Sequence, residues 1–188
     1  MQTTQPMTPF DKRAQRTKNA IKASFKAIMR SKPLCDVTVK EVMEQAGVNR
    51  ATFYSHYSNL EELAADIEVS CASQVRAEID SELQKYSSPT TEDAIGCACD
   101  ILLADRESCL WIAGSQATGR GRKILREHCA KHWAIGKPRG KAADELVFSI
   151  FFDGAIALLG RWATGDAGLE EIEVKNAIMS VARRLADC

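Results

Sequence analysis

Gly47 is the residue that most constrains the fold of this chain, because it separates two segments that each carry the signals of a short helix. Upstream, Thr38 with Glu41 three residues later fits a capping box. An apolar stripe at helical spacing follows, formed by Val39, Val42, Met43 and Ala46. Downstream, Asn49 is a favourable N-cap for a second short helix over residues 50–57. Since glycine accepts the left-handed conformation that ends helices, the spacing predicts a helix-turn-helix.

Helical periodicity, broken at glycine and proline, recurs along the chain, and no alternating apolar run indicates a strand. We expect helices over about 10–31, 38–46, 50–57, 59–86, 91–105, 108–117, 120–135, 142–164 and 169–186. No apolar run approaches the ~20 residues that span a bilayer. The prediction is an all-α chain without a membrane segment. Residues 1–58 would form a three-helix domain with the helix-turn-helix, and residues 59–188 a larger helical domain.

Charge is divided unevenly although the chain is neutral overall. Residues 1–57 hold ten Lys/Arg and four Asp/Glu, a balance of +6, and the remainder holds fifteen against twenty-one, a balance of −6. A basic first third favours contact with a polyanion. The seven cysteines are odd in number and irregularly spaced, and the N-terminus has no apolar signal segment. We therefore expect a cytoplasmic protein whose thiols are reduced and packed as small apolar side chains.

The second helix of a helix-turn-helix lies in the major groove while other helices contact phosphates. Arg50 can bond the O6 and N7 atoms of guanine, and Ala51 or the Thr52 methyl can touch the methyl of thymine. Phe53 and Tyr57 fall on the opposite side and should pack in the core. The predicted DNA-binding residues are Thr38, Asn49, Arg50, Ala51, Thr52, Tyr54, Ser55, His56 and Asn59.

The run VTVKEVMEQAGVNRATFYSHYSNLEEL, residues 37–63, resembles the DNA-binding signature of the TetR family of bacterial transcriptional regulators. The resemblance covers about residues 10–65. It implies an all-α homodimer that binds a palindromic operator in double-stranded DNA, with a small effector bound by the C-terminal domain. In this pattern Thr38 contacts a phosphate. The family usually has a lysine where this chain has Leu60, so Asn59 would supply a weaker, neutral contact there.

The segment FFDGAIALLGRWATGD, residues 151–166, is similar to the penultimate helix of such regulators, which packs with the last helix in a dimeric four-helix bundle. The predicted dimer interface contains Phe151, Ala155, Leu158, Trp162, Ile172 and Met179. Family resemblance places the effector pocket in the middle of the chain. The predicted pocket residues are Cys97, Ile101, Leu110, Trp111, Gly114, Gln116, His128, Trp133 and Phe152.

The leading hypothesis is a homodimeric repressor that a small-molecule effector releases from its operator. An enzyme is not expected, because no nucleophile, phosphate-binding or metalloprotease motif appears. His128 and His132 could share a helix face, but a solvated basic helix is the simpler interpretation, since no acidic or cysteine ligand is fixed beside them. The sequence therefore predicts no metal, cofactor or catalytic residue. The alternatives are a helical interaction module and a redox- or metal-responsive regulator with the same fold.

Overall fold

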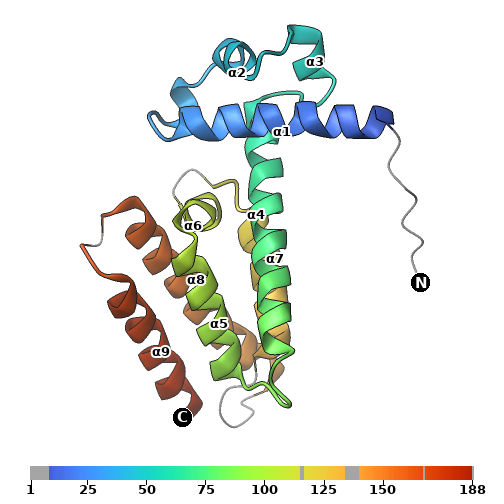
Figure 1. Cartoon of the computed structure of the whole chain (residues 1–188). Coiled ribbons are helices and arrows are strands. Elements are labelled where there is room, and N and C mark those ends of the chain that lie inside the picture. The colour runs from blue at the N-terminus through green and yellow to red at the C-terminus, as the bar shows by residue number, and fades with distance from the viewer. Residues whose placement is uncertain (1–8, 115–116, 134–139, 167, 188) are drawn as a thin grey trace. The chain divides into compact units, whose positions relative to one another are not determined.

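The computed structural model describes residues 9–114, 117–133, 140–166 and 168–187 (Figure 1). The elements in chain order are α1 (Pro9–Met29), the 3₁₀ turn η1 (Leu34–Asp36), α2 (Val39–Ala46), α3 (Arg50–Tyr54), α4 (Leu60–Leu83), α5 (Thr91–Ala104), α6 (Arg106–Ala113), α7 (Arg120–Cys129), the 3₁₀ turn η2 (Ala130–His132), α8 (Lys141–Thr164) and α9 (Glu171–Asp187). No strand occurs among these residues, so the predicted all-α fold is confirmed. Within them, no helix is long and apolar enough to cross a membrane.

The chain separates into two compact units, one ending at Ala64 and the other starting at Ala65. In unit 1, α1 packs against α2, and α2 contacts α3 (Figure 1). Apolar side chains from every helix of the unit are buried at its centre: Ile21, Phe25, Ile28, Val37, Val42, Phe53, Tyr57, Leu60 and Leu63. Helix α3 is therefore held to the unit by one face, as the predicted burial of Phe53 and Tyr57 requires.

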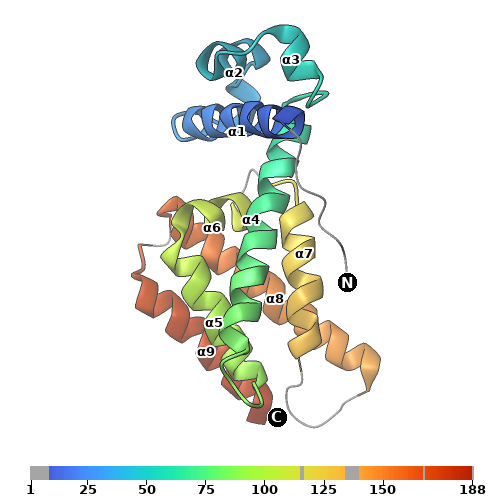
Figure 2. The same cartoon turned by 45° about the vertical axis from the view of Figure 1, so that its right-hand side comes forward.

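In unit 2, α8 and α9 pack against each other and against α6 and α5 respectively (Figure 2). Gly160 allows the close approach of α8 to α6, because a Cβ there would lie 2.3 Å from the Ala113 carbonyl oxygen. Arg106 joins the same helices, since its Nε donates to the Ala163 carbonyl at 2.8 Å and its guanidinium lies over the Trp162 ring. These contacts place α5, α6, α8 and α9 around one apolar core.

A buried carboxylate fixes the start of α7. Glu68 is fully buried, and its Oε atoms accept from the backbone N–H groups of Thr118, Gly119 and Gly121 at 2.8, 3.1 and 3.0 Å. The Thr118 hydroxyl also donates to Glu68. Gly121 has no room for a side chain, since a Cβ would lie 2.7 Å from Glu68 Cγ and 2.9 Å from its carbonyl oxygen. A negative charge is stabilised at a helix N-terminus, so Glu68 orients α7 against α4.

Most helix boundaries lie close to the expected ones, and the differences have local causes. Helix α6 begins at Arg106 instead of residue 108, because the Asp105 side chain caps it by accepting from the Ser108 N–H. Helix α3 ends at Tyr54 instead of residue 57, and the Ser55 hydroxyl donates to the Thr52 carbonyl at that end. Residues 134–135 of the expected seventh helix lie outside the described residues.

Candidate nucleic-acid interface and pocket

The turn of the helix-turn-helix has the predicted chemistry. Thr38 caps α2 in a full capping box, in which its Oγ1 accepts from the Glu41 N–H and Glu41 Oε2 accepts from the Thr38 N–H at 2.9 Å. Gly47 ends α2 in the left-handed conformation, with φ 65°. Asn49 caps α3 by accepting from the Thr52 N–H at 2.8 Å. Each signal is satisfied within four residues, so the local sequence is sufficient to build the turn.

Helix α3 presents its polar face to solvent. Arg50, Ala51, Tyr54 and Ser55 are exposed, and Thr52 and His56 are half-buried. The Arg50 guanidinium lies over the Tyr54 ring at 5.2 Å from its centroid, so the two exposed side chains support each other. Phe53 contacts Tyr57 from the buried side, with their ring centroids 6.0 Å apart. A five-residue helix thus combines a buried anchor with an exposed surface that carries hydrogen-bonding groups.

Some predicted DNA-binding residues already have structural roles. The Asn49 and Asn59 side chains accept from backbone N–H groups at the starts of α3 and α4, and both residues are exposed. The exposed Thr38 hydroxyl donates to Glu41 Oε2 at 2.8 Å. Leu60 is buried, with 8% of its surface exposed, so this position belongs to the core of unit 1. The phosphate contact that a lysine would make at residue 60 is therefore absent from this chain.

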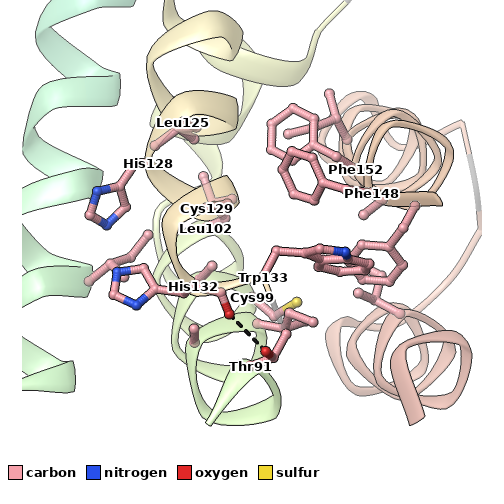
Figure 3. Close-up of a pocket in the computed structure, with 18 of the residues that line it drawn as sticks. Thr91, Cys99, Leu102, Leu125, His128, Cys129, His132, Trp133, Phe148 and Phe152 are labelled. Atoms are coloured by element: carbon pink, nitrogen blue, oxygen red, sulfur yellow. Dashed lines mark hydrogen bonds between the residues drawn. The ribbon is translucent and has the colours of Figure 1, made fainter. Parts of the chain in front are cut away.

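Unit 2 contains an apolar cavity of about 60 Å³ between α5, α7, α8 and α9 (Figure 3). Trp133 lies at its wall, with its ring centroid 5.1 Å from those of Phe148 and Phe151. The Thr91 hydroxyl donates to the His132 carbonyl at 2.7 Å and so joins α5 to η2 beside the cavity. Further lining residues are Ile79, Leu125, His128, Cys129, His132, Phe152, Ala155, Ile156, Leu159 and Ile178.

The structure brings three of the nine predicted pocket residues to this cavity: His128, Trp133 and Phe152. Cys97, Ile101, Leu110, Trp111 and Gly114 do not line it, and Gln116 lies outside the described residues. Helix α5 contributes a different face, formed by Ala94, Ile95, Ala98, Cys99 and Leu102. These residues recur at helical spacing, so this apolar stripe could have identified the inward face of α5 from the sequence.

The predicted dimer residues divide between the surface and the core of unit 2. Phe151, Ala155 and Leu158 line a surface groove between α8 and α9, and Ile172 is 61% exposed. Trp162 and Met179 are buried within the chain because they pack inside unit 2. The sequence interpretation missed three large exposed apolar residues of the two helices: Leu146, Ile150 and Val181.

His128 does not lie on a solvated helix as expected, because it is buried with 5% of its surface exposed. Burial lowers the pKa of its imidazole, and the nearby Asp80 carboxylate acts in the opposite direction. His128 Nε2 lies 3.4 Å from Asp80 Oδ1. The fold has therefore brought an acidic residue of α4 to the histidine pair, which the sequence spacing could not reveal.

The cysteines described by the structure are free thiols. Burial raises the pKa of Cys99 and Cys109 to about 12 and that of Cys129 to about 11, and it also raises the pKa of the half-buried Cys97. Since the thiolate is the reactive form, the raised pKa of these four thiols disfavours their reaction at neutral pH. Their environment matches the predicted role of cysteine as a small apolar side chain.

Comparison with known proteins agrees with this architecture. The family model of the bacterial regulatory proteins of the TetR family matches residues 26–67. An uncharacterised HTH-type transcriptional regulator of Bacillus subtilis, YxbF, is 36% identical over 82 residues. That match spans 43% of this chain and 20% of the relative's length.

Solved structures with the same fold cover nearly the whole chain. A TetR transcriptional regulator from Streptococcus agalactiae has a TM-score of 0.65 at 17% identity, over 92% of this chain and 97% of its own. A TetR-family regulator from Streptomyces coelicolor has a TM-score of 0.66 at 15% identity, over 90% and 99%. The fatty acid degradation regulator FadR from Bacillus halodurans has a TM-score of 0.64 at 12% identity, over 95% and 96%. The predicted resemblance to the TetR family of bacterial regulatory proteins is confirmed for the N-terminal part of the chain, where residues 26–67 match the family model.

Proposed function

We propose that the chain is a homodimeric transcriptional repressor that binds a palindromic operator and is released by a small-molecule effector. The observation that carries the DNA-binding step is the exposed front of α3, where Arg50 and Tyr54 reach solvent while Phe53 anchors the helix. Residues 1–58 would read the DNA, and residues 59–188 would bind the effector and the second copy. The basic balance of residues 1–57, ten cations against four anions, favours the approach of unit 1 to phosphates.

In the proposed complex, Arg50 reads a guanine, and Ala51 and Thr52 contact a thymine methyl. Tyr54, Ser55 and His56 lie beside them and would bond bases or phosphates. Thr38 and Asn59 are exposed at the starts of α2 and α4, where free backbone N–H groups also favour a phosphate. The exposure of Arg50, Ala51, Tyr54 and Ser55 and the chemistry of these side chains support the assignments, and Thr52 and His56 are half-buried at the same face.

Selection of bound genomic fragments by the purified full chain tests DNA binding and yields the operator. Arg50→Ala should then weaken operator binding by about 1–3 kcal/mol, roughly 5- to 160-fold, and relax the base preference at one position. Arg16→Ala, an exposed cation of α1, should weaken binding to all sequences and reduce the salt slope by about one. Lys85→Ala, two residues after the end of α4, is the control and should leave DNA binding unchanged. Unchanged binding by Arg50→Ala would favour the alternative, an interaction module with the same fold.

The exposed face of α8 and α9 supports the homodimer. Ile150 is 76% exposed, Leu146 65% and Val181 50%, beside the groove that Phe151, Ala155 and Leu158 line. A contiguous exposed apolar face of this kind indicates a protein interface. A twofold dimer also matches a palindrome, in which the two reading helices lie about 34 Å apart.

Sedimentation velocity of the full chain tests the dimer. Ile150→Glu should sediment as a monomer and lose most operator affinity, because both half-sites must be bound together. Leu110→Glu introduces the same charge at an exposed leucine of α6, and this variant should remain dimeric. A wild-type chain that is monomeric at micromolar concentration would contradict the assignment.

The apolar cavity of unit 2 is the proposed effector site. Its volume of about 60 Å³ is well below the ~300–1,000 Å³ of pockets that hold drug-sized ligands. The effector would therefore be small and apolar, or would displace Trp133 on entry. Release of DNA requires the effector to prefer one conformation, and a tenfold preference corresponds to ~1.4 kcal/mol.

A thermal-shift screen of small apolar compounds, followed by operator-binding assays, tests this site. Ala98→Phe fills the cavity and should abolish both the thermal shift and the release of DNA. Ala104→Phe adds the same group at an exposed position of the same helix and should preserve both. Compounds that stabilise both variants and release DNA from both would show that the effector binds outside this cavity.

A further inference from the structure

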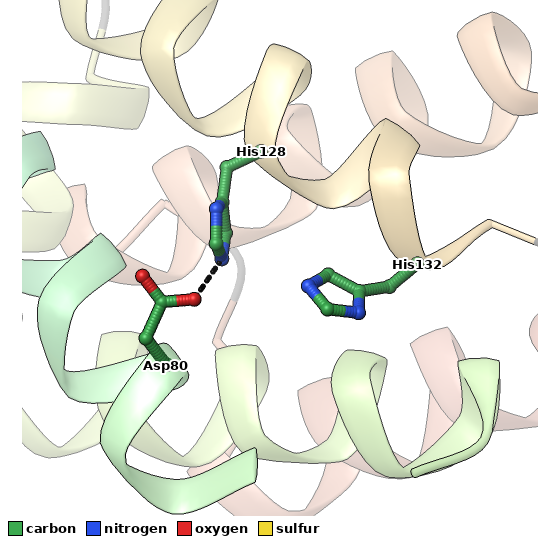
Figure 4. A group of neighbouring side chains, drawn as sticks. All are labelled: Asp80, His128 and His132. Atoms are coloured by element: carbon green, nitrogen blue, oxygen red, sulfur yellow. Dashed lines mark ion pairs between the residues drawn. The ribbon is translucent and has the colours of Figure 1, made fainter. Parts of the chain in front are cut away.

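We propose that Asp80, His128 and His132 form a binding site for a divalent first-row transition metal ion, with Zn²⁺ as the ion best suited to the donor set. One ligand atom from each of the three side chains lies within 4.8 Å of the other two (Figure 4). The residues come from α4, α7 and η2, so the cluster exists only after folding. This site is independent of the proposed DNA binding and would exist in a chain that binds no DNA.

His128 provides the first argument. It is 5% exposed, and its Nε2 is buried without a hydrogen-bond partner among the residues that the structure describes. A buried polar atom of this kind is unfavourable unless it is paired. Nε2 lies 3.4 Å from Asp80 Oδ1, which is longer than an ordinary hydrogen bond. Two ligands of a tetrahedral ion with bonds of about 2.0–2.1 Å are separated by about 3.3–3.4 Å. The pair therefore has the spacing of two metal ligands.

His132 supplies the third donor. Its ring centroid lies 5.4 Å from that of His128, in an edge-to-face arrangement. The backbone at this position is fixed, because the His132 carbonyl accepts from the Thr91 hydroxyl. The His132 side chain is half-buried and the Asp80 side chain is half exposed, so both can rotate towards an ion while His128 stays in place. Small rotations of two side chains would complete the site.

The donor set and its surroundings define the expected ion. Two imidazoles and one carboxylate are typical ligands of Zn²⁺, and three protein ligands leave a fourth position for water or a small molecule. His128 and His132 also line the apolar cavity, so the ion would lie at the wall of that cavity. Arg76 and Lys131 are close enough to act on His128 electrostatically, and their charges oppose a cation. We therefore expect moderate affinity.

Metal titration of the full, tag-free chain after chelator treatment is the direct test. Calorimetry with Zn²⁺ should give one ion per chain, and Co²⁺ should produce the visible bands of a tetrahedral site. No thiolate-to-cobalt absorption should accompany them, because none of the three ligands is a cysteine. Absence of binding at micromolar concentration would overturn the proposal, and so would a thiolate band.

The variants identify the ligands. Asp80→Asn and His132→Ala change the two more accessible ligands. Each variant should weaken Zn²⁺ binding by about 10- to 100-fold or more, because the loss of a residue that only supports a ligand already has an effect of that size. Thermal unfolding without metal establishes that both variants fold. His56→Ala removes the remaining histidine of the chain, which lies in unit 1, and should bind Zn²⁺ like the wild type. Binding that is lost in His56→Ala but kept in the other two variants would contradict this assignment.

Discussion

Unit 1 and unit 2 differ in how far apart in the sequence their interacting residues lie. In unit 1, the caps at Thr38, Gly47 and Asn49 all close within four residues. In unit 2, Glu68 bonds residues 50 to 53 positions away. Substituting a local cap removes the interaction at one helix end. Substituting a residue that joins distant segments removes several interactions at once. We therefore expect single substitutions to have unequal effects in the two units.

The largest effect is expected for Glu68→Ala. It leaves the N–H groups of Thr118, Gly119 and Gly121 without their acceptor and empties the buried site of the side chain, so it should destabilise unit 2 by about 2–4 kcal/mol. Trp111, Trp133 and Trp162 are the tryptophans of the chain, and all lie in unit 2. Urea unfolding followed by tryptophan fluorescence therefore measures this loss directly.

Glu78→Ala is the matched control, since Glu78 is an exposed residue of the same helix. Its cost should stay within about 0.5 kcal/mol. Equal urea midpoints for the two variants would show that the distant contacts of Glu68 do not stabilise unit 2. The proposed difference between the two units would then be contradicted.

The next effect is expected at Gly47, whose φ of 65° is unfavourable for other residues. Gly47→Ala should destabilise unit 1 by about 1–2 kcal/mol and weaken operator binding. The tryptophan-detected transition should be unchanged. Gly96→Ala makes the same substitution inside α5, where the added Cβ meets one methyl carbon at 3.9 Å. That variant should stabilise unit 2 by about 0.5–1 kcal/mol.

A smaller effect is expected for the two capping boxes, which have the same chemistry in different units. Thr38→Ala removes the cap of α2 and Thr90→Ala that of α5. Each should cost about 1 kcal/mol, because a cap is a local interaction wherever it lies. Circular dichroism reports the first variant and tryptophan fluorescence the second. A much larger destabilisation by Thr90→Ala than by Thr38→Ala would contradict this expectation, because it would show that the effect of a helix cap depends on the unit in which it lies.

The smallest effect should appear as a pH dependence. The Lys32 side chain, with the Thr38 N–H and hydroxyl, lowers the pKa of Glu41 from 4.5 to about 2. The folded state therefore favours the carboxylate, so this stabilisation is complete above pH 4.5 and is lost as the pH falls towards 2. Glu41→Gln should unfold with a weaker dependence on pH in that range. The pKa of Asp93 in unit 2 is also lowered, by Thr90, so Asp93→Asn should act likewise on the fluorescence transition.

The sequence was sufficient for unit 1 because its signals are local. The capping box, the left-handed glycine and the burial of Phe53 all lie where their residue types predict. The end of α3 was predicted three residues late, since a short helix has few side chains to mark its end. Which exposed residues read bases remains a prediction, because DNA contacts are not determined by exposure.

The sequence was insufficient for the cavity because its walls depend on the rotation of each helix about its axis. Of the residues predicted for the effector pocket, His128, Trp133 and Phe152 line this cavity, whereas Cys97 and Ile101 lie off the face that α5 turns inward. Asp80 is 48 positions from His128, so no spacing rule could join them. Long-range neighbours of this kind require the fold itself.

The burial of the thiols makes the chain suitable for selective labelling. Cys99, Cys109 and Cys129, with pKa values of about 11 to 12, are ionised only to roughly 10⁻⁴ to 10⁻⁵ at pH 7. Among the cysteines whose surroundings the structure describes, Cys35 is the exposed one, and it lies in η1, immediately before α2. A maleimide fluorophore should therefore react with Cys35 before the other cysteines that the structure describes. The native sequence thus carries a reporter position beside the helix-turn-helix, without any cysteine having to be introduced.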